Sequence, residues 1–84
     1  MNTIHNKAYQ ALINSLRLAR RRKKFTQVEL AHALRKDQSY VSKYERSERR
    51  LDVIEVRTIC KALGISFADF VRSFERELKR KGLS

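Results

Sequence analysis

The chain has 84 residues, enough for one small domain, and its 20 Lys and Arg against 9 Asp and Glu give a formal charge of +11. Such a balance favours an anionic partner, and a polyphosphate above all. A single cysteine excludes an internal disulfide, two histidines cannot build a metal-ligand cluster, and no apolar run approaches the roughly 18 residues of a membrane span. We therefore expect a cytoplasmic protein with no metal, no cofactor and no membrane contact.

The first predicted helix runs from about Ala8 to Lys24, because apolar residues recur there at the 3.6-residue spacing of one helix face. Residues 1–7 lack that spacing and are expected to form a loose arm. The first 24 residues carry seven basic groups and no acid. Their densest part, Arg20 to Lys24, has two kinds of interpretation of equal weight. One is a solvated helix end or a targeting or solubility run, and the other is a phosphate-binding segment.

Four N-cap signals mark the starts of four further helices. Three of them place a capping side chain three residues before an acid: Thr26 with Glu29, Asp52 with Glu55, and Ser66 with Asp69. Asp37 is the fourth, ahead of a helix from Gln38 to Glu45. The chain has no proline, and both glycines fall at apparent helix ends. The sequence thus predicts an all-α domain of five helices with short connections.

The last two predicted helices supply much of the apolar surface. The helix from Asp52 to Leu63 is expected to bury Ile59, Cys60, Leu63 and either Val53 or Val56, with Ile54 left open. We interpret the lone thiol as a small core residue. The final helix begins at Ser66, and its distal apolar stripe has two possible roles, closure of the core or contact with a second copy of the chain. The candidates for that contact are Phe70, Phe74 and Leu78. We expect the domain to span residues 8–78, followed by a basic tail, 79–84.

The segment from Thr26 to Glu45 is the most informative part of the chain. It predicts two short helices joined by a tight turn, with a shared apolar face formed by Leu30, Ala31, Leu34, Val41 and Tyr44. The face left free carries Gln38, Ser39, Ser42 and Lys43. Amide, ammonium and hydroxyl groups are the ones that read base edges in the major groove of DNA. The alternative is an ordinary solvated helix face in a small bundle.

These residues resemble the lambdoid phage repressor and Cro-like helix-turn-helix family, the xenobiotic-response-element class of regulators. The match rests on three segments: Thr26–Ala31, Gln38–Glu45 and Ile59–Ser66. It spans about residues 9–75. The resemblance implies a compact five-helix fold in which the second and third helices form the helix-turn-helix, and the third enters the major groove.

The resemblance also implies roles for individual residues. Gln38, Ser39 and Lys43 would approach base edges, with Ser42 at the margin. Gln27 would contact a phosphate and brace Gln38, and Arg46 would contact another phosphate. The extra charge at Arg35, Lys36, Arg49 and Arg50 suits a surface near phosphates. The predicted phosphate contacts are Gln27, Lys36, Arg46, Arg49 and Arg50. A structural ion pair is implied between Arg20 and Glu45.

Three positions depart from the family pattern. Arg35 stands where the turn between the two motif helices usually has glycine, Ser47 replaces a second glycine, and Leu51 replaces a frequent proline. A side chain in a left-handed conformation costs on the order of 1 kcal/mol, so the turn at Arg35 is expected to be reshaped or mildly strained.

The expected function is sequence-specific binding of double-stranded DNA by a small prokaryotic or phage transcription regulator. One such module reads little DNA, so a homodimer on an inverted repeat is expected. Two alternatives stay open, an antitoxin that binds a toxin and its own operator, and an adaptor with a vestigial motif. Enzyme activity is not expected, because no nucleophile, glycine-rich phosphate loop or metal site can be assembled from these residues.

Overall fold

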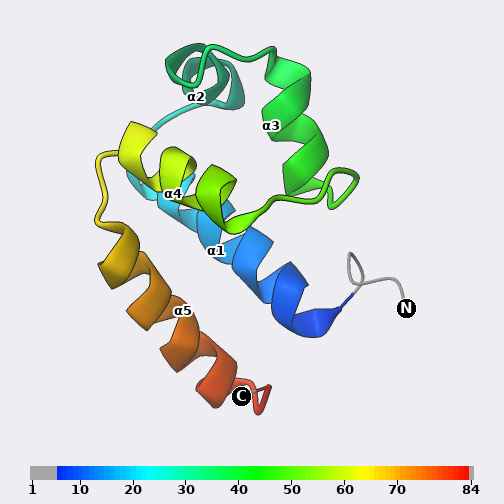
Figure 1. Cartoon of the computed structure of the whole chain (residues 1–84), viewed down its shortest axis with the longest axis vertical. Coiled ribbons are helices and arrows are strands. Elements are labelled where there is room, and N and C mark those ends of the chain that lie inside the picture. The colour runs from blue at the N-terminus through cyan, green and yellow to red at the C-terminus, as the bar shows by residue number, and fades with distance from the viewer. Residues whose placement is uncertain (1–5, 84) are drawn as a thin grey trace.

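A computed structural model describes residues 6–83, and within that range the chain forms five helices and no strand (Figure 1). In chain order the helices are α1 (Lys7–Arg22), α2 (Gln27–Ala33), α3 (Gln38–Glu45), α4 (Val53–Ala62) and α5 (Phe67–Arg80). The predicted all-α class and the order of its helices are confirmed. None of the described helices is long and apolar enough to cross a membrane.

Side-chain caps fix four of the five helix starts. The Asn6 carboxamide oxygen accepts from two backbone N–H groups of α1, 2.8 and 3.2 Å away. Thr26 and Asp52 each form a complete capping box, and Ser66 accepts from the N–H three residues on. Asp37 occupies the N-cap of α3, but its side chain makes no hydrogen bond to the first turn. The start of α3 therefore has no side-chain cap, but its first residue, Gln38, is bonded through its amide to Gln27.

The bounds of the first helix differ slightly from the predicted ones. The first helix begins at Lys7, because Asn6 caps it, so residue 7 belongs to the helix and not to an arm. Residues 1–5 of that predicted arm lie outside the described residues. The same helix ends at Arg22, before the predicted Lys24.

The last helix is longer than predicted. It continues through Lys79 and Arg80, which were expected to belong to a tail. Its final turns stay ordered because Leu78 is buried and because Arg80 pairs with Glu77 one turn earlier, at 2.6 Å.

One apolar core joins all five helices. Its buried members are Ile13, Leu16, Leu30, Ala31, Val41, Tyr44, Leu51, Val56, Ile59, Cys60, Leu63 and Phe70. The open choice on α4 is resolved in favour of Val56, because Val53 and Ile54 are both more than 60% exposed. Cys60 has no exposed surface, and this burial raises the pKa of its thiol to about 11. The predicted role of Cys60 as a small core residue is confirmed.

Helix α1 is the central element of the fold (Figure 1). It packs against α3 and α5, while α2 packs on α3 and α4 on α5. The connection between α3 and α4 is hydrogen-bonded to α1, since the N–H of Leu51 donates to the Tyr9 hydroxyl oxygen at 3.0 Å. This arrangement holds α2 and α3 together at one end of the molecule, with the C-terminal end of α5 at the opposite end (Figure 1).

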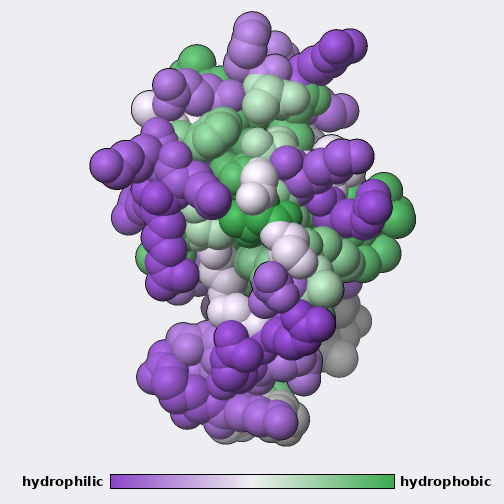
Figure 2. Space-filling view, turned by 90° about the vertical axis from the view of Figure 1, so that its left-hand side faces the viewer, coloured by the Kyte–Doolittle hydropathy of each residue, from purple (hydrophilic) through white to green (hydrophobic). Residues whose placement is uncertain are grey.

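Some apolar surface stays outside the core. The exposed large hydrophobic residues among those described are Leu18, Val28, Val53, Ile54 and Val71. Figure 2 shows hydrophobic residues reaching the surface in the upper half of one side of the molecule, while hydrophilic residues cover the lower part. Apolar surface of this kind is available for contact with another molecule.

Candidate nucleic-acid interface

The packing of α2 on α3 sorts the residues of the motif into two groups. The inward residues are Leu30, Ala31, Val41 and Tyr44, each at most 2% exposed. The outward residues of α3 are Gln38, Ser39 and Lys43, all exposed, with Ser42 half-buried. All four predicted base-reading residues therefore lie on one helix, and none of them belongs to the apolar core.

A buried ion pair anchors this surface. The Arg20 guanidinium donates from Nε to Glu45 Oε2 at 2.7 Å and from Nη2 to Glu45 Oε1 at 3.0 Å. The side chains are 9% and 3% exposed, respectively. The remaining nitrogen of the guanidinium, Nη1, donates to the Phe25 carbonyl oxygen at 2.8 Å. Hydrogen bonding to Glu45 raises the pKa of Arg20. The pair ties the C-terminal part of α1 to the end of α3.

Two glutamine amides extend this pair to the surface. Gln27 Nε2 donates to Glu45 Oε1 at 2.9 Å, and Gln38 Nε2 donates to Gln27 Oε1 at 3.0 Å. A continuous chain of hydrogen bonds therefore runs from the buried guanidinium to the first residue of α3. These bonds fix the orientation of both amides. The Glu45 carboxylate can only accept, so Gln27 turns its NH2 group toward it and its oxygen toward Gln38, which donates to that oxygen.

This orientation defines what Gln38 can do. Its amide nitrogen has two N–H groups, of which Gln27 takes one, and its carbonyl oxygen accepts no hydrogen bond within residues 6–83. One donor and one acceptor remain side by side on an exposed side chain. That pair of groups matches the N7 acceptor and N6 donor of adenine in the major groove.

Arg46, just after α3, is already engaged by protein groups. Its Nη1 group donates to the Ser42 hydroxyl oxygen, and its Nε and Nη2 groups donate to Glu48 at 2.9 and 3.1 Å. This pair is more than half exposed, and the arginine holds the pKa of Glu48 below its ordinary value. Glu48 was not anticipated from the sequence. A phosphate that binds Arg46 through these nitrogens must displace the carboxylate of Glu48.

The ring of Tyr40 contacts two of the predicted phosphate-binding residues. The Lys36 ammonium lies 5.4 Å from its ring centroid and the Arg49 guanidinium 4.7 Å, both as cation–π contacts. Arg49 also pairs with Glu55 of α4 at 2.9 Å, and this hydrogen bond is the main cause of the lowered pKa of Glu55. Neither contact could be read from the sequence, because Lys36 lies outside α3 and Glu55 belongs to α4.

A second tyrosine organises the next arginine. The guanidinium of Arg50 lies 5.3 Å from the ring centroid of Tyr9, whose hydroxyl oxygen accepts from the N–H of Leu51. Arg49 and Arg50 are thus held on two different aromatic rings, one from α3 and one from α1. The connection between α3 and α4 presents its basic residues in defined positions.

The predicted dimer candidates have different surroundings. Phe70 and Leu78 are each 8% exposed, so they close the interior of the single chain and have little surface left for a partner. Phe74 is half-buried and lines a cavity of about 300 Å³ between α5 and the start of α4. Two exposed valines, Val53 and Val71, line the same cavity.

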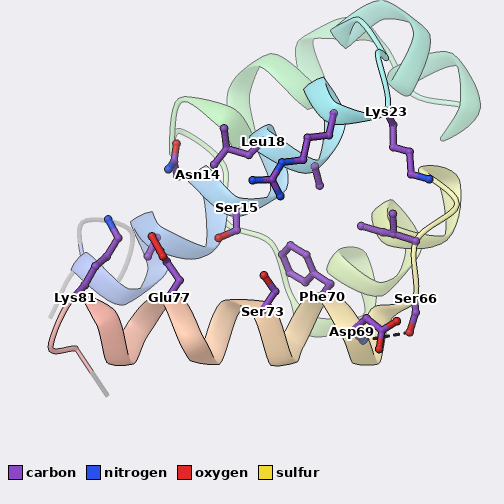
Figure 3. A pocket seen from close by; sticks show the side chains of 14 residues that line it. Asn14, Ser15, Leu18, Lys23, Ser66, Asp69, Phe70, Ser73, Glu77 and Lys81 are labelled. Carbon is purple, nitrogen blue, oxygen red and sulfur yellow. Dashed lines mark hydrogen bonds between the residues drawn. The ribbon is translucent and has the colours of Figure 1, made fainter.

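A larger cavity lies elsewhere, between α1 and α5, with a volume of about 530 Å³ (Figure 3). Its labelled side chains include Ser15 and Leu18 from α1 and Phe70 and Ser73 from α5. None of its lining residues is a histidine or a cysteine. Across residues 6–83, moreover, no group of three or more His, Cys, Asp or Glu residues could hold a metal ion.

Comparison with known proteins identifies the motif. The model of the helix-turn-helix family HTH_3 matches residues 16–70, which include α2, α3 and α4. An XRE-family like protein from Pseudomonas syringae pv. tomato is 45% identical, with a TM-score of 0.81 over 89% of this chain and 92% of that one. No curated protein matches the chain.

Two further solved structures have the same fold. The wild-type restriction-modification controller protein C.Esp1396I is 26% identical, with a TM-score of 0.81 over 88% of this chain and 95% of that one. The clp gene regulator ClgR from Corynebacterium glutamicum is 31% identical, with a TM-score of 0.76 over 89% and 80%. Both the family match and these likenesses extend over most of the five-helix domain.

Proposed function

We propose that α3 enters the major groove of DNA and reads base edges. The chain belongs to the XRE-type helix-turn-helix family of DNA-binding transcription regulators. One observation carries this proposal. The chain of hydrogen bonds from Arg20 through Glu45 and Gln27 fixes the amide of Gln38 on an exposed helix face, with one donor and one acceptor unused. A side chain held in this way meets a base without first losing conformational freedom.

The other residues of the interface have separate tasks. Lys43 donates to the N7 and O6 acceptors of guanine, and Ser39 bonds to either kind of base. Ser42, already bonded to Arg46, lies at the margin. The predicted phosphate contacts position the protein on the duplex without reading its sequence. They are Gln27, Lys36, Arg46, Arg49 and Arg50.

The protein is proposed to act as a two-fold symmetric dimer on an inverted repeat, with half-sites about 34 Å apart, one turn of DNA. The surface best suited to a second copy surrounds the cavity beside Phe74, because Val53 is 63% and Val71 38% exposed there. Pairing two such surfaces removes these valines from water. Phe70, which also lines this cavity, supports the surface from inside.

Substitution of Val71 by glutamate is expected to prevent dimer formation. A carboxylate in a desolvated apolar contact has no partner, so the chain should behave as a 10.0 kDa species in light scattering, where the unchanged protein has twice that mass. Ser73→Glu is the matched control, because it adds the same charge to α5 but on the side that faces the groove in Figure 3. If light scattering gives a mass of 10.0 kDa for the unchanged protein at micromolar concentration, the protein does not form a stable dimer.

The proposed function itself is tested by selection of bound duplexes from a random pool. We expect an inverted repeat whose half-sites are centred about 10 base pairs apart, since two copies of α3 must enter successive major grooves. Sequencing of the retained duplexes measures this directly. Retention of duplexes without any consensus would show that the protein binds DNA only through phosphates.

A further inference from the structure

All five helices end in the same way. The first residue beyond each C-cap donates its N–H three residues back, and the next residue donates its N–H five residues back. At the end of α1, for example, Lys24 donates to the Arg21 carbonyl oxygen at 2.9 Å, and Phe25 donates to that of Arg20 at 3.1 Å. This pair of bonds requires a left-handed backbone at the first residue beyond the cap. The five residues in that position are Lys24, Arg35, Ser47, Gly64 and Gly82, with φ of 61°, 57°, 58°, 72° and 71°.

Glycine is the residue that adopts this conformation without strain, and α4 and α5 have it. At Gly64 and Gly82 an added Cβ would meet no atom within 4 Å. Steric crowding therefore does not explain the glycines, and the backbone conformation alone does. The same conformation occurs after α1, α2 and α3, where a side chain is present in spite of the strain it brings.

Two of these three strained residues share further properties. Lys24 and Arg35 are cations with exposed side chains, and neither makes an ion pair or a side-chain hydrogen bond within residues 6–83. They stand at the two ends of α2, one before its Thr26 cap and the other directly after Leu34, its C-cap. Helix α2 is the element that packs on α3 and positions Gln27.

The favourable effect of a cation at a helix end does not explain these positions. A cation in the last turn interacts with the helix dipole from ordinary backbone geometry, as Lys23 does at the C-cap of α1 with φ of −83°. The end of α1 also has three arginines in its last turn. No further charge is needed at a left-handed position. Contact with another molecule would give these two exposed cations a use that offsets the strain.

We propose that Lys24 and Arg35 bind DNA phosphates at the two ends of α2, and that their side chains serve this contact at a cost in stability. This proposal rests on the proposed function. Strain kept at positions with no structural use is typical of functional sites. The turn of the helix-turn-helix is in this view a phosphate-binding element, and α2 is held against the duplex from both ends.

Glycine substitutions separate stability from binding. Lys24→Gly and Arg35→Gly are each expected to raise the thermal midpoint by about 4 °C, because they remove the strain. Because a dimer loses one phosphate contact from each protomer, each variant should also bind a labelled duplex with the selected site roughly thirty-fold more weakly near 150 mM salt. The slope of log affinity against log salt should fall by about 1.8. Scanning calorimetry and fluorescence anisotropy measure the two effects.

Three control variants assign the cause. Ser47→Gly relieves the same backbone conformation without removing charge, so it should raise the midpoint and leave the salt slope unchanged. Arg35→Lys should keep the slope, because the charge is retained. Lys79→Ser removes one charge from the end of α5 that lies away from α2 (Figure 1), and it should also keep the slope.

Two results would overturn the proposal, and they can be distinguished. If the unchanged protein binds the duplex but both glycine variants keep its salt slope, Lys24 and Arg35 are not phosphate contacts, while the proposed function stands. If the unchanged protein does not bind any duplex from the pool, the proposed function fails and this proposal fails with it. A smaller slope in both glycine variants, together with unchanged slopes in Ser47→Gly and Lys79→Ser, supports it.

Discussion

Substitution of Glu45 by leucine is expected to lower the free energy of unfolding by about 3 to 5 kcal/mol. The change removes both acceptors of the Arg20 guanidinium, whose side chain is only 9% exposed, and leaves its charge uncompensated. Gln27 also loses the acceptor for its amide N–H. In a chain of only 84 residues such a loss is a large part of the total stability.

The measurement is urea unfolding followed by circular dichroism, with two comparisons. Glu48→Leu breaks an ion pair whose side chains are more than half exposed, and it should cost less than about 1 kcal/mol. The double variant Arg20→Met with Glu45→Leu removes both buried charges and should recover most of the lost stability. If Glu45→Leu costs no more than Glu48→Leu, the buried pair is not an anchor of the fold.

The affinity for DNA is expected to fall about a thousandfold between 50 and 200 mM salt. This follows if the bound protein neutralises six phosphates in all, because each neutralised phosphate releases condensed counterions. The net charge of +11 and the basic residues around α3 support such a number. Fluorescence anisotropy with a labelled duplex, repeated across this range of salt, gives the slope directly.

Two outcomes of this titration would be informative. Affinity that does not depend on salt would contradict the assignment of the basic residues to phosphates. A slope well below the expected one would indicate that Arg46 and Arg49 keep Glu48 and Glu55 as partners in the complex, since both arginines are paired in the free protein.

Much of the fold follows from local signals in the sequence. The caps at Thr26, Asp52 and Ser66 depend on residues three positions apart, and each forms the expected bond to the helix start. The apolar spacing of α2 and α3 likewise depends on neighbouring turns. The start of α1 was missed by one residue, because Asn6 has no acid three residues later to complete a capping box.

The parts that could not be predicted depend on contacts between distant segments. Tyr9 accepts a hydrogen bond from Leu51, 42 positions away, and Tyr40 meets Arg49 and Glu55 only once α4 has packed. Neither contact leaves a periodic pattern. The choice between Val53 and Val56 was open for a similar reason, since both fit the spacing and only the packing of α4 decides which one is buried.

The chemistry of the candidate site was predictable from residue types, whereas its organisation was not. Gln38, Ser39 and Lys43 were identified because they have no apolar task, and they are exposed together on α3. Their use as base readers stays a prediction. That Arg46 is bonded to Ser42 and Glu48 could not be read from the sequence, because an exposed arginine has several partners within reach.

The central claim is that the outward face of α3 reads the base sequence, and one measurement tests it most directly. The selection from a random duplex pool is repeated with Gln38→Ala beside the unchanged protein. Loss of a bidentate contact is worth about 1 to 3 kcal/mol of discrimination, so the consensus should lose its preference at one position in each half-site and keep the others. If both proteins select the same consensus at every position, or neither selects any, Gln38 does not read DNA and the claim is wrong.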